Sequence, residues 1–194
     1  MMRVFAWGAA CPPAYDKGSM PYQRTIITDG HPTLRKVAKK VHPEELRDPL
    51  VQQLIDDMFE TMYEAPGIGL AAPQVNISKR IFTVDLQDDD PEHGPFVVVN
   101  PKFDLTEGEL ESTEGCLSVP GMVGEVTRFE RVAVSGLDRD GKKIRLEGDG
   151  LFARCLQHEI DHLNGVLYID KVRNLREART DEELEALDEA SALP

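Results

Sequence analysis

The chain contains few cysteines, few aromatic residues and little positive charge. Three cysteines in 194 residues are too few for a disulfide-stabilised scaffold. Lys and Arg number 22 against 35 Asp and Glu, which gives a formal charge of -13. This balance argues against nucleic-acid binding, which depends on basic residues that neutralise phosphates, and against docking on anionic lipid. No apolar run approaches the ~18 residues needed to cross a bilayer, so a membrane protein is excluded as well.

The composition, 41% hydrophobic and 29% charged, is typical of a globular protein with one sizeable core. We expect three segments. Residues 1–19 form an N-terminal extension ahead of a natural start near Met20, residues 20–172 form the single domain, and residues 173–194 form an acidic tail with a short helix. The apolar stretch near the N-terminus is short for a signal peptide, which favours a cytoplasmic protein.

Two helices are predicted from apolar periodicity and end signals. Asp48 and Pro49 supply an N-cap and a first helical residue for a helix over residues 49–63. A second helix begins near Gly150 and is stopped by Asn164 and Gly165. The second helix is apolar over much of its circumference, so we expect it to be buried under the strands.

The remaining periodic segments predict strands. A hairpin turn is expected at Asp140 and Gly141. The Gly-rich stretch over residues 67–75 fits neither a helical nor a strand period. Strands separated by few helices favour an α+β fold, with antiparallel or mixed sheets packed around a buried central helix. The expected strands cover residues 80–85, 96–100, 131–138, 143–147 and 166–170.

The second helix carries the pattern His-Glu-x-x-His. His158 and His162 are four residues apart, so both imidazoles lie on one face and can reach one metal ion. Glu159 is rotated by about 100° from His158, which lets its carboxylate meet a water on that metal without being a ligand. The motif predicts a metal-dependent hydrolase.

A catalytic metal site of this kind needs a third protein ligand. The metzincin pattern would place it at position 168, where the chain has Tyr168. A gluzincin would use a glutamate such as Glu182, Glu183 or Glu185, but these lie in the polar tail. Cys116 is the better candidate, and we expect it at the start of an extended segment. The alternative for Cys116 is a small buried hydrophobic residue.

Three segments occur in the order found in peptide deformylases: residues 67–74 (GIGLAAPQ), 114–118 (EGCLS) and 157–162 (QHEIDH). The chain resembles this family over residues 24–172. The resemblance implies a metal-dependent amide hydrolase that removes the formyl group from the N-terminal formyl-methionine of nascent polypeptides and releases formate.

The resemblance also implies the roles of individual residues. Cys116, His158 and His162 would bind one divalent metal, with water as the fourth ligand. Glu159 would move the proton from this water to the leaving amine. The Gln74 side-chain amide and the Leu117 backbone N–H would form an oxyanion hole.

Substrate contacts follow from the same resemblance. Gly67, Ile68 and Gly69 would present backbone along which the peptide lies as an added strand. Ile68, Leu117, Leu151 and Cys155 would lie near the methionine pocket. For Cys155 plain core packing is an equally good interpretation. Glu114 is expected to pair with Arg128 rather than to touch substrate.

The resemblance favours Fe²⁺, although a thiolate with two imidazoles also suits Zn²⁺, Ni²⁺ or Co²⁺. The expected partners are N-formyl-methionyl nascent peptides near the ribosome exit, with no nucleic acid and no membrane. The expected assembly is a monomer or weak dimer. Two alternatives remain: a zinc peptidase that cleaves internal peptide bonds, and a non-catalytic homologue that binds peptide termini. The presence of every residue that the chemistry needs argues against the second.

Overall fold

The computed structural model describes residues 20–87 and 92–178. Within these ranges the chain forms two α-helices, α1 (Pro49–Glu64) and α2 (Gly150–Leu163). No helix in these ranges combines the length and the apolar character needed to cross a membrane. The strands are β1 (Gly69–Ala71), β2 (Ile81–Val84), β3 (Phe96–Glu107), β4 (Leu110–Gly115), β5 (Met122–Arg128), β6 (Arg131–Leu137), β7 (Lys143–Asp149) and β8 (Arg173–Glu177). Short 3-10 helices cover Pro32–Arg35, Pro43–Arg47, Ala72–Val75 and Tyr168–Asp170.

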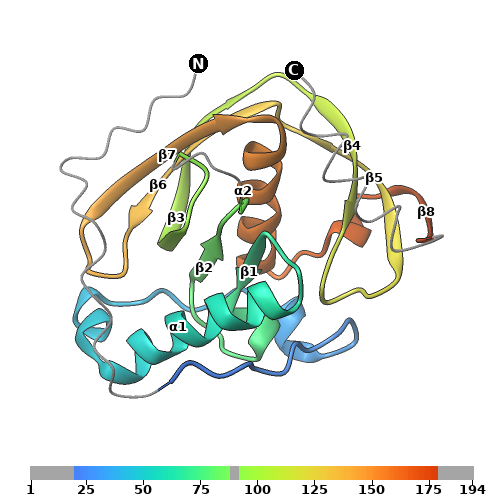
Figure 1. Cartoon of the computed structure of the whole chain (residues 1–194). Coiled ribbons are helices and arrows are strands. Elements are labelled where there is room, and N and C mark those ends of the chain that lie inside the picture. Colours follow the sequence, from blue (N-terminus) through green and yellow to red (C-terminus); the bar gives the residue numbers. More distant parts are fainter. Residues whose placement is uncertain (1–19, 88–91, 179–194) are drawn as a thin grey trace.

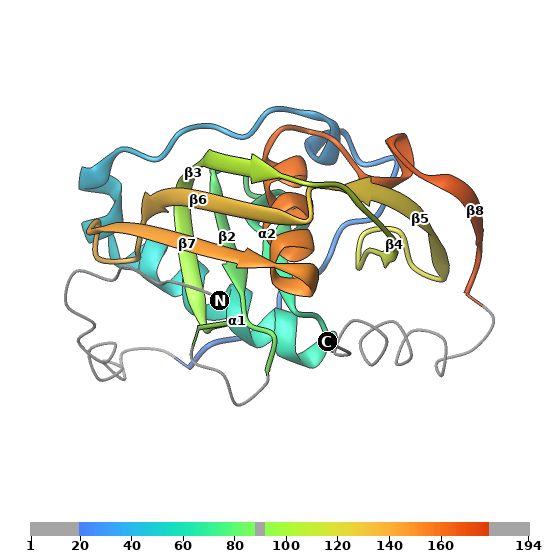
Figure 2. The same cartoon turned by 90° about the horizontal axis from the view of Figure 1, so that it is seen from above.

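The strands form two antiparallel sheets. Five strands pair in the order β1-β2-β3-β6-β7, and three pair in the order β4-β5-β8. Helix α2 lies between the two sheets, and both views show it in the middle of the molecule (Figures 1 and 2). The expected α+β class with a buried central helix is therefore confirmed.

The five-stranded sheet is covered by a helix on each face. On β3, Val98 belongs to the core cluster with α2, whereas Val97 and Val99 belong to the cluster with α1. On β2, Phe82 belongs to the cluster with α2 and Ile81 to the cluster with α1. Successive strand residues point to opposite faces, so apolar side chains at consecutive positions fill both layers of the core.

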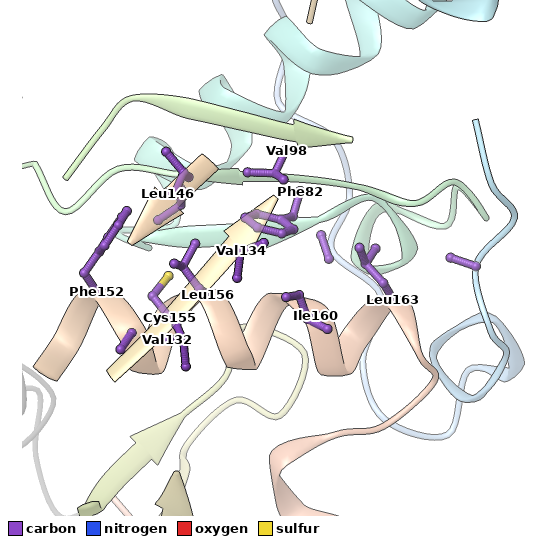
Figure 3. Packing of buried hydrophobic residues seen from close by; sticks show 14 residues of the cluster. Phe82, Val98, Val132, Val134, Leu146, Phe152, Cys155, Leu156, Ile160 and Leu163 are labelled. Carbon is purple, nitrogen blue, oxygen red and sulfur yellow. The ribbon is translucent and has the colours of Figure 1, made fainter. Parts of the chain in front are cut away.

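Helix α2 is anchored by its apolar side chains. Phe152, Leu156 and Ile160 are almost fully buried and pack towards the sheet, where Figure 3 shows Phe82 and Val134 facing them. Burying a side chain of this size stabilises the fold by about 1.5–3 kcal/mol. This face holds α2 in place and leaves the opposite face free to carry polar groups.

The helix ends agree with the sequence signals. The Asp48 side chain accepts a hydrogen bond from Leu50 N at 2.9 Å and caps α1, which extends one residue beyond the predicted 49–63. Helix α2 ends at Leu163, and Gly165 follows in the left-handed region with φ +75°. A Cβ at position 165 would lie 2.8 Å from the Arg35 carbonyl carbon, so the glycine also permits close chain approach.

Two of the strand predictions need correction. The segment 166–170 was expected to be a strand, but it contains a 3-10 helix, Tyr168–Asp170. The Asp170 carboxylate accepts a hydrogen bond from Leu167 N at 2.9 Å and closes this turn. Strand β3 continues past the expected end at Asn100, because a register shift between Val99 and Lys102 accommodates the intervening proline. The hairpin turn at Asp140 and Gly141 is confirmed by the pairing of β6 with β7.

The three-stranded sheet was missing from the sequence prediction. The residues of β4 are mostly polar and show no clean alternation of burial, so neither period identified this strand. Strand β8 lies in the segment assigned to the acidic tail, yet it pairs with β5. The division of the chain after residue 172 stays a prediction, and the short helix predicted in the tail lies outside the described residues.

Candidate active site

Three side chains with metal-binding atoms converge between the two sheets. Cys116 follows β4, whereas His158 and His162 lie one turn apart on α2. The Cys116 Sγ is 3.3 Å from the His162 Nε2, and the two Nε2 atoms are 3.2 Å apart. One potential ligand atom from each residue lies within 4.8 Å of the others. The structure thus brings together the three residues that the sequence proposed as ligands.

The spacing of these atoms fits a small metal ion. A tetrahedral ion with bonds of about 2.0 Å to nitrogen and 2.3 Å to sulfur separates two nitrogens by about 3.3 Å and a nitrogen from sulfur by about 3.5 Å. The observed separations of 3.2 and 3.3 Å are close to these values. Two imidazoles and a thiolate suit several first-row metals, so the donor set fits a divalent ion without selecting one.

A buried ion pair orients one of the histidines. The Glu114 Oε2 lies 2.9 Å from the His158 Nδ1, which directs the Nε2 towards Cys116. Arg128 donates to both Glu114 oxygens at 2.7 and 2.9 Å, and its Nη1 donates to Asp161. Because Arg128 and Glu114 are both buried, each charge is stabilised chiefly by the other. The expected pairing of Glu114 with Arg128 is confirmed.

The two imidazoles have different protonation preferences. Burial lowers the pKa of His158, but hydrogen bonds to Cys116 and Glu114 outweigh it and leave this pKa above its ordinary value. Burial together with the nearby positive charge on His158 lowers the pKa of His162 below its ordinary value. Metal binding would replace the proton on His158, because a ligand nitrogen must be deprotonated.

Glu159 is a buried carboxylate beside the three potential metal ligands. Its side chain is 3% exposed, and burial raises its pKa to about 7. Among the side chains of the described residues, Glu159 Oε2 is one of two buried polar atoms without a hydrogen-bond partner. A carboxylate with this pKa can accept and release a proton near neutral pH.

Gln74 is held with its amide nitrogen towards Cys116. Its Oε1 accepts a hydrogen bond from Ala71 N at 2.8 Å, so its Nε2 points the other way. This Nε2 donates to Ser118 Oγ at 3.3 Å and lies 3.7 Å from Cys116 Sγ. The side chain is buried, which fixes a hydrogen-bond donor beside the potential metal ligands.

Leu117 lies in a turn rather than an extended segment. Val119 N donates to Cys116 O at 2.8 Å, which closes the turn directly after β4. The expectation that Cys116 starts an extended segment is therefore wrong; it ends one. The turn reverses the chain and brings both Cys116 and Leu117 to the same cavity.

A cavity of about 680 Å³ adjoins these groups. A Cβ on Gly69 would lie 2.5 Å from Glu159 Oε1 and 2.8 Å from Cys155 Sγ, so this wall is in close contact with α2. Cys155 belongs to both the cavity wall and the core cluster, which accommodates both interpretations of this residue (Figure 3). Every proposed substrate-binding residue lines the cavity: Gly67, Ile68, Gly69, Leu151 and Cys155.

Some cavity residues were not identified from the sequence. Gly115 and Met122 line the cavity at the two ends of the Cys116 turn. Their closeness in sequence to Cys116 is the signal that could have identified them. Arg154 lines it from α2, where it donates to Thr113 O at 3.2 Å. Tyr168, the residue at the metzincin position, donates its hydroxyl proton to Met122 O at 2.8 Å. Glu182, Glu183 and Glu185 lie outside the described residues.

Comparison with known proteins decides the family. A family model described as polypeptide deformylase matches residues 23–178. The chain belongs to the polypeptide deformylase family. A peptide deformylase from Pseudomonas aeruginosa is 52% identical over 161 residues, which are 82% of this chain and 93% of that protein.

Solved structures of the family have the same fold. A peptide deformylase from Legionella pneumophila is 42% identical with a TM-score of 0.73, over 89% of this chain and 99% of that one. A Met-Ala-Ser-bound class I type b peptide deformylase from Acinetobacter baumannii is 36% identical with a TM-score of 0.73, over 79% of this chain and 100% of that one.

Proposed function

We propose that this protein removes the formyl group from the N-terminal formyl-methionine of newly made polypeptides and releases formate. Its membership of the polypeptide deformylase family supports this activity. The observation that carries the proposal is the convergence of Cys116, His158 and His162 beside a cavity that is also lined by Glu159 and Gln74. This combination provides a metal site, a proton carrier and a hydrogen-bond donor around one space.

Cys116, His158 and His162 would hold one divalent metal ion. When bound, the ion supplies a Lewis acid that polarises the formyl carbonyl group and acidifies a water molecule. Fe²⁺ is the proposed native ion, and Zn²⁺, Ni²⁺ and Co²⁺ suit the same ligands. Glu114 keeps His158 oriented through its 2.9 Å contact with Nδ1.

Glu159 acts as general base and then as general acid. Its carboxylate takes the proton from the attacking water and delivers it to the amine nitrogen as the C–N bond breaks. Burial, which raises its pKa to about 7, matches both steps to neutral pH. Its position against Gly69 places the carboxylate beside the segment that is proposed to hold the peptide.

Gln74 and Leu117 stabilise the developing negative charge. The Gln74 Nε2 and the Leu117 backbone N–H donate to the formyl oxygen as the carbonyl becomes tetrahedral. The Ala71 N–H fixes the Gln74 amide in advance, so no reorientation is needed during the reaction. A neutral amide also avoids competing with the metal for the water.

The substrate backbone lies along Gly67, Ile68 and Gly69. The methionine side chain occupies the apolar part of the cavity, which Ile68, Leu117, Leu151 and Cys155 help to form. The Acinetobacter baumannii relative with bound Met-Ala-Ser supports a site for a peptide that begins with methionine. Glu114 is committed to Arg128 and His158, so it has a structural task.

The cellular setting follows from the proposed substrate. Formylated nascent peptides are available in the cytoplasm near the ribosome exit, where we propose that the protein acts as a monomer or weak dimer. The negative formal charge of -13 disfavours direct binding to nucleic acid.

Formate release from formyl-Met-Ala-Ser tests the proposed activity. Protein purified without oxygen and loaded with Fe²⁺ should release formate, and metal content should be measured on the same sample. A matched peptide with an acetyl group in place of the formyl group tests whether the protein discriminates between the two acyl groups. Cleavage at an internal bond, with no formate released, would replace this proposal by that of a zinc peptidase.

The proposed iron has a separate test. A thiolate-ligated Fe²⁺ centre is open to oxidation, so activity of the iron-loaded protein should be lost in air while the circular dichroism is unchanged. Nickel-loaded protein kept in the same air should retain its activity. Stable activity of the aerated sample, with iron still bound, would contradict the proposed exposure of the metal.

A further inference from the structure

The backbone of residues 67–69 lies very close to the proposed proton carrier. A Cβ at Gly69 would lie 2.5 Å from Glu159 Oε1, and one at Gly67 would lie 2.9 Å from Leu117 Cδ1. The segment is therefore enclosed by both walls of the cavity. A displacement of a few tenths of an ångström would change how a bound peptide meets Glu159 and Leu117. Fixing this segment consequently matters for the reaction.

Gln87 holds the start of this segment from outside the cavity. Its Nε2 donates to the Gly67 carbonyl at 3.0 Å. Gly67 N donates to Met62 O at 2.9 Å, and Asp85 N donates to Ile68 O at 2.9 Å. Strand β1 itself begins only at Gly69, so these three bonds position the residues that precede it.

The backbone of Gln87 adopts a conformation that side chains rarely take. Its φ is +57°, in the left-handed region, although it is neither glycine nor asparagine. Gln87 N donates to Asp85 Oδ1 at 3.0 Å, and this bond holds the turn. Strain of this kind persists only where surrounding contacts impose it, and it is concentrated at functional sites.

Asp85 connects this turn to helix α1. Its second carboxylate oxygen accepts a hydrogen bond from the Tyr63 hydroxyl at 2.7 Å. Partial burial and the bond to Asp85 raise the pKa of Tyr63 above its ordinary value. The chain of contacts therefore runs from the last turn of α1 through Asp85 to Gln87 and Gly67.

We propose that Gln87 is a positioning residue for the substrate peptide, supported by Asp85 and Tyr63. It acts through Gly67: its amide fixes the carbonyl of Gly67 and thereby the distance of the peptide-binding backbone from Glu159. Gln87 is exposed, so its side chain adds little to the packed core. This inference rests on the proposed deformylation, because it assigns residues 67–69 to the binding of the peptide.

The variant Gln87→Gly distinguishes the effect of the side-chain amide from the effect of the backbone conformation. Glycine adopts a positive φ without strain, so this change removes the donor and leaves the turn intact. We expect KM for formyl-Met-Ala-Ser to rise about threefold to tenfold, as for the loss of one hydrogen bond, with kcat reduced less. Gln87→Asn, which tolerates the same φ but has a shorter side chain, should give an intermediate value.

Asn174→Gly is the matched control. Asn174 also has a positive φ, +54°, and its amide donates to Glu125 Oε2 at 2.8 Å. It lies on β8, which belongs to the other sheet and forms the edge of the molecule away from β1 (Figure 1). We expect its KM to equal that of the wild type. Tyr63→Phe should raise KM about twofold, because it removes the hydrogen bond that holds the Asp85 carboxylate but leaves the Gln87 amide in place.

Amide hydrogen exchange in the zinc-loaded protein supplies a readout that does not depend on turnover. Exchange at Gly67 should become faster in Gln87→Gly and should be unchanged in Asn174→Gly. An unchanged or lower KM with unchanged exchange would overturn the proposal. If the wild type itself released no formate, the proposed function would fail. Faster exchange at Gly67 in Gln87→Gly would then still support the positioning of Gly67 by Gln87, and unchanged exchange would refute it.

Discussion

The two α-helices both bury polar side chains, but they differ in whether these side chains have hydrogen-bond partners. In α1, Asp57 is fully buried and receives hydrogen bonds from Arg24, Gln53 and Tyr22 N. Thr61, one turn later, donates to Asp57 O at 2.6 Å and accepts from Arg24 N at 2.8 Å. Every buried side-chain nitrogen or oxygen of α1 has a partner in the described structure.

Helix α2 retains two unpartnered atoms. Gln157 is fully bonded to Phe129 and Ala153, as a structural group would be. Glu159 Oε2 and His162 Nδ1 have no partner within the described residues. Leaving a buried polar atom unsatisfied costs about 1–3 kcal/mol. In α1 the buried polar groups therefore bind the N-terminal segment to the domain, whereas in α2 one Glu159 oxygen lacks a partner, as the role proposed for this residue requires.

Replacing the thiolate should have the largest effect on the α2 site. Cys116→Ser should lose most of the bound metal and nearly all activity, because serine is a poor ligand at neutral pH. Cys155→Ser, the matched control, should retain the metal. Metal content and the spectrum of the cobalt-loaded protein measure both, and full occupancy with an unchanged spectrum in Cys116→Ser would contradict the ligand assignment.

Removing the unpartnered carboxylate should come next. Glu159→Gln should keep metal and fold, but lose activity by about 10²–10⁴-fold, as expected for a general base. Its thermal stability should be unchanged or higher, since a buried group with a raised pKa favours an uncharged replacement. Formate release, metal content and melting temperature test this. A fall in metal content that matches the loss of activity would make Glu159 a metal-supporting residue instead.

The corresponding change in α1 should affect stability rather than chemistry. Asp57→Ala leaves Arg24 and two further donors without their acceptor, and should lower the free energy of unfolding by about 2–4 kcal/mol. The activity per folded molecule should remain close to that of the wild type. Chemical denaturation and active-site titration check the two parts, and a loss of kcat at full folding would show that α1 also serves the site.

The smallest effect is expected on the outer face of α1. Leu50 is 77% exposed, so Leu50→Ser should change the free energy of unfolding by no more than about 0.5 kcal/mol. Denaturant titration measures it. A larger loss would mean that this leucine is covered by another surface in solution.

The local signals were sufficient where an element repeats one period between clear ends. Helix α1 was predicted to within one residue, and Gly165 stopped α2 as expected. Strand β4 escaped detection because its polar residues follow no period, and its place is set by pairing with β5. The predicted strand ended too early, at an asparagine followed by a proline. In the structure β3 continues past both residues through a shift in the strand register.

The sequence by itself determined how His158, Glu159 and His162 lie relative to one another, because they share a helix and their placement follows from the helical repeat. Only the tertiary structure decided that Cys116 contacts His162 of that helix and that Gln74 lies beside Cys116, because these residues are distant in sequence. The tertiary structure also buries Glu159, which raises its pKa, and brings the Gln87 amide within hydrogen-bond distance of the Gly67 carbonyl. The physical reason is that burial and contact between distant segments depend on how sheets and helices pack, and no local period records that.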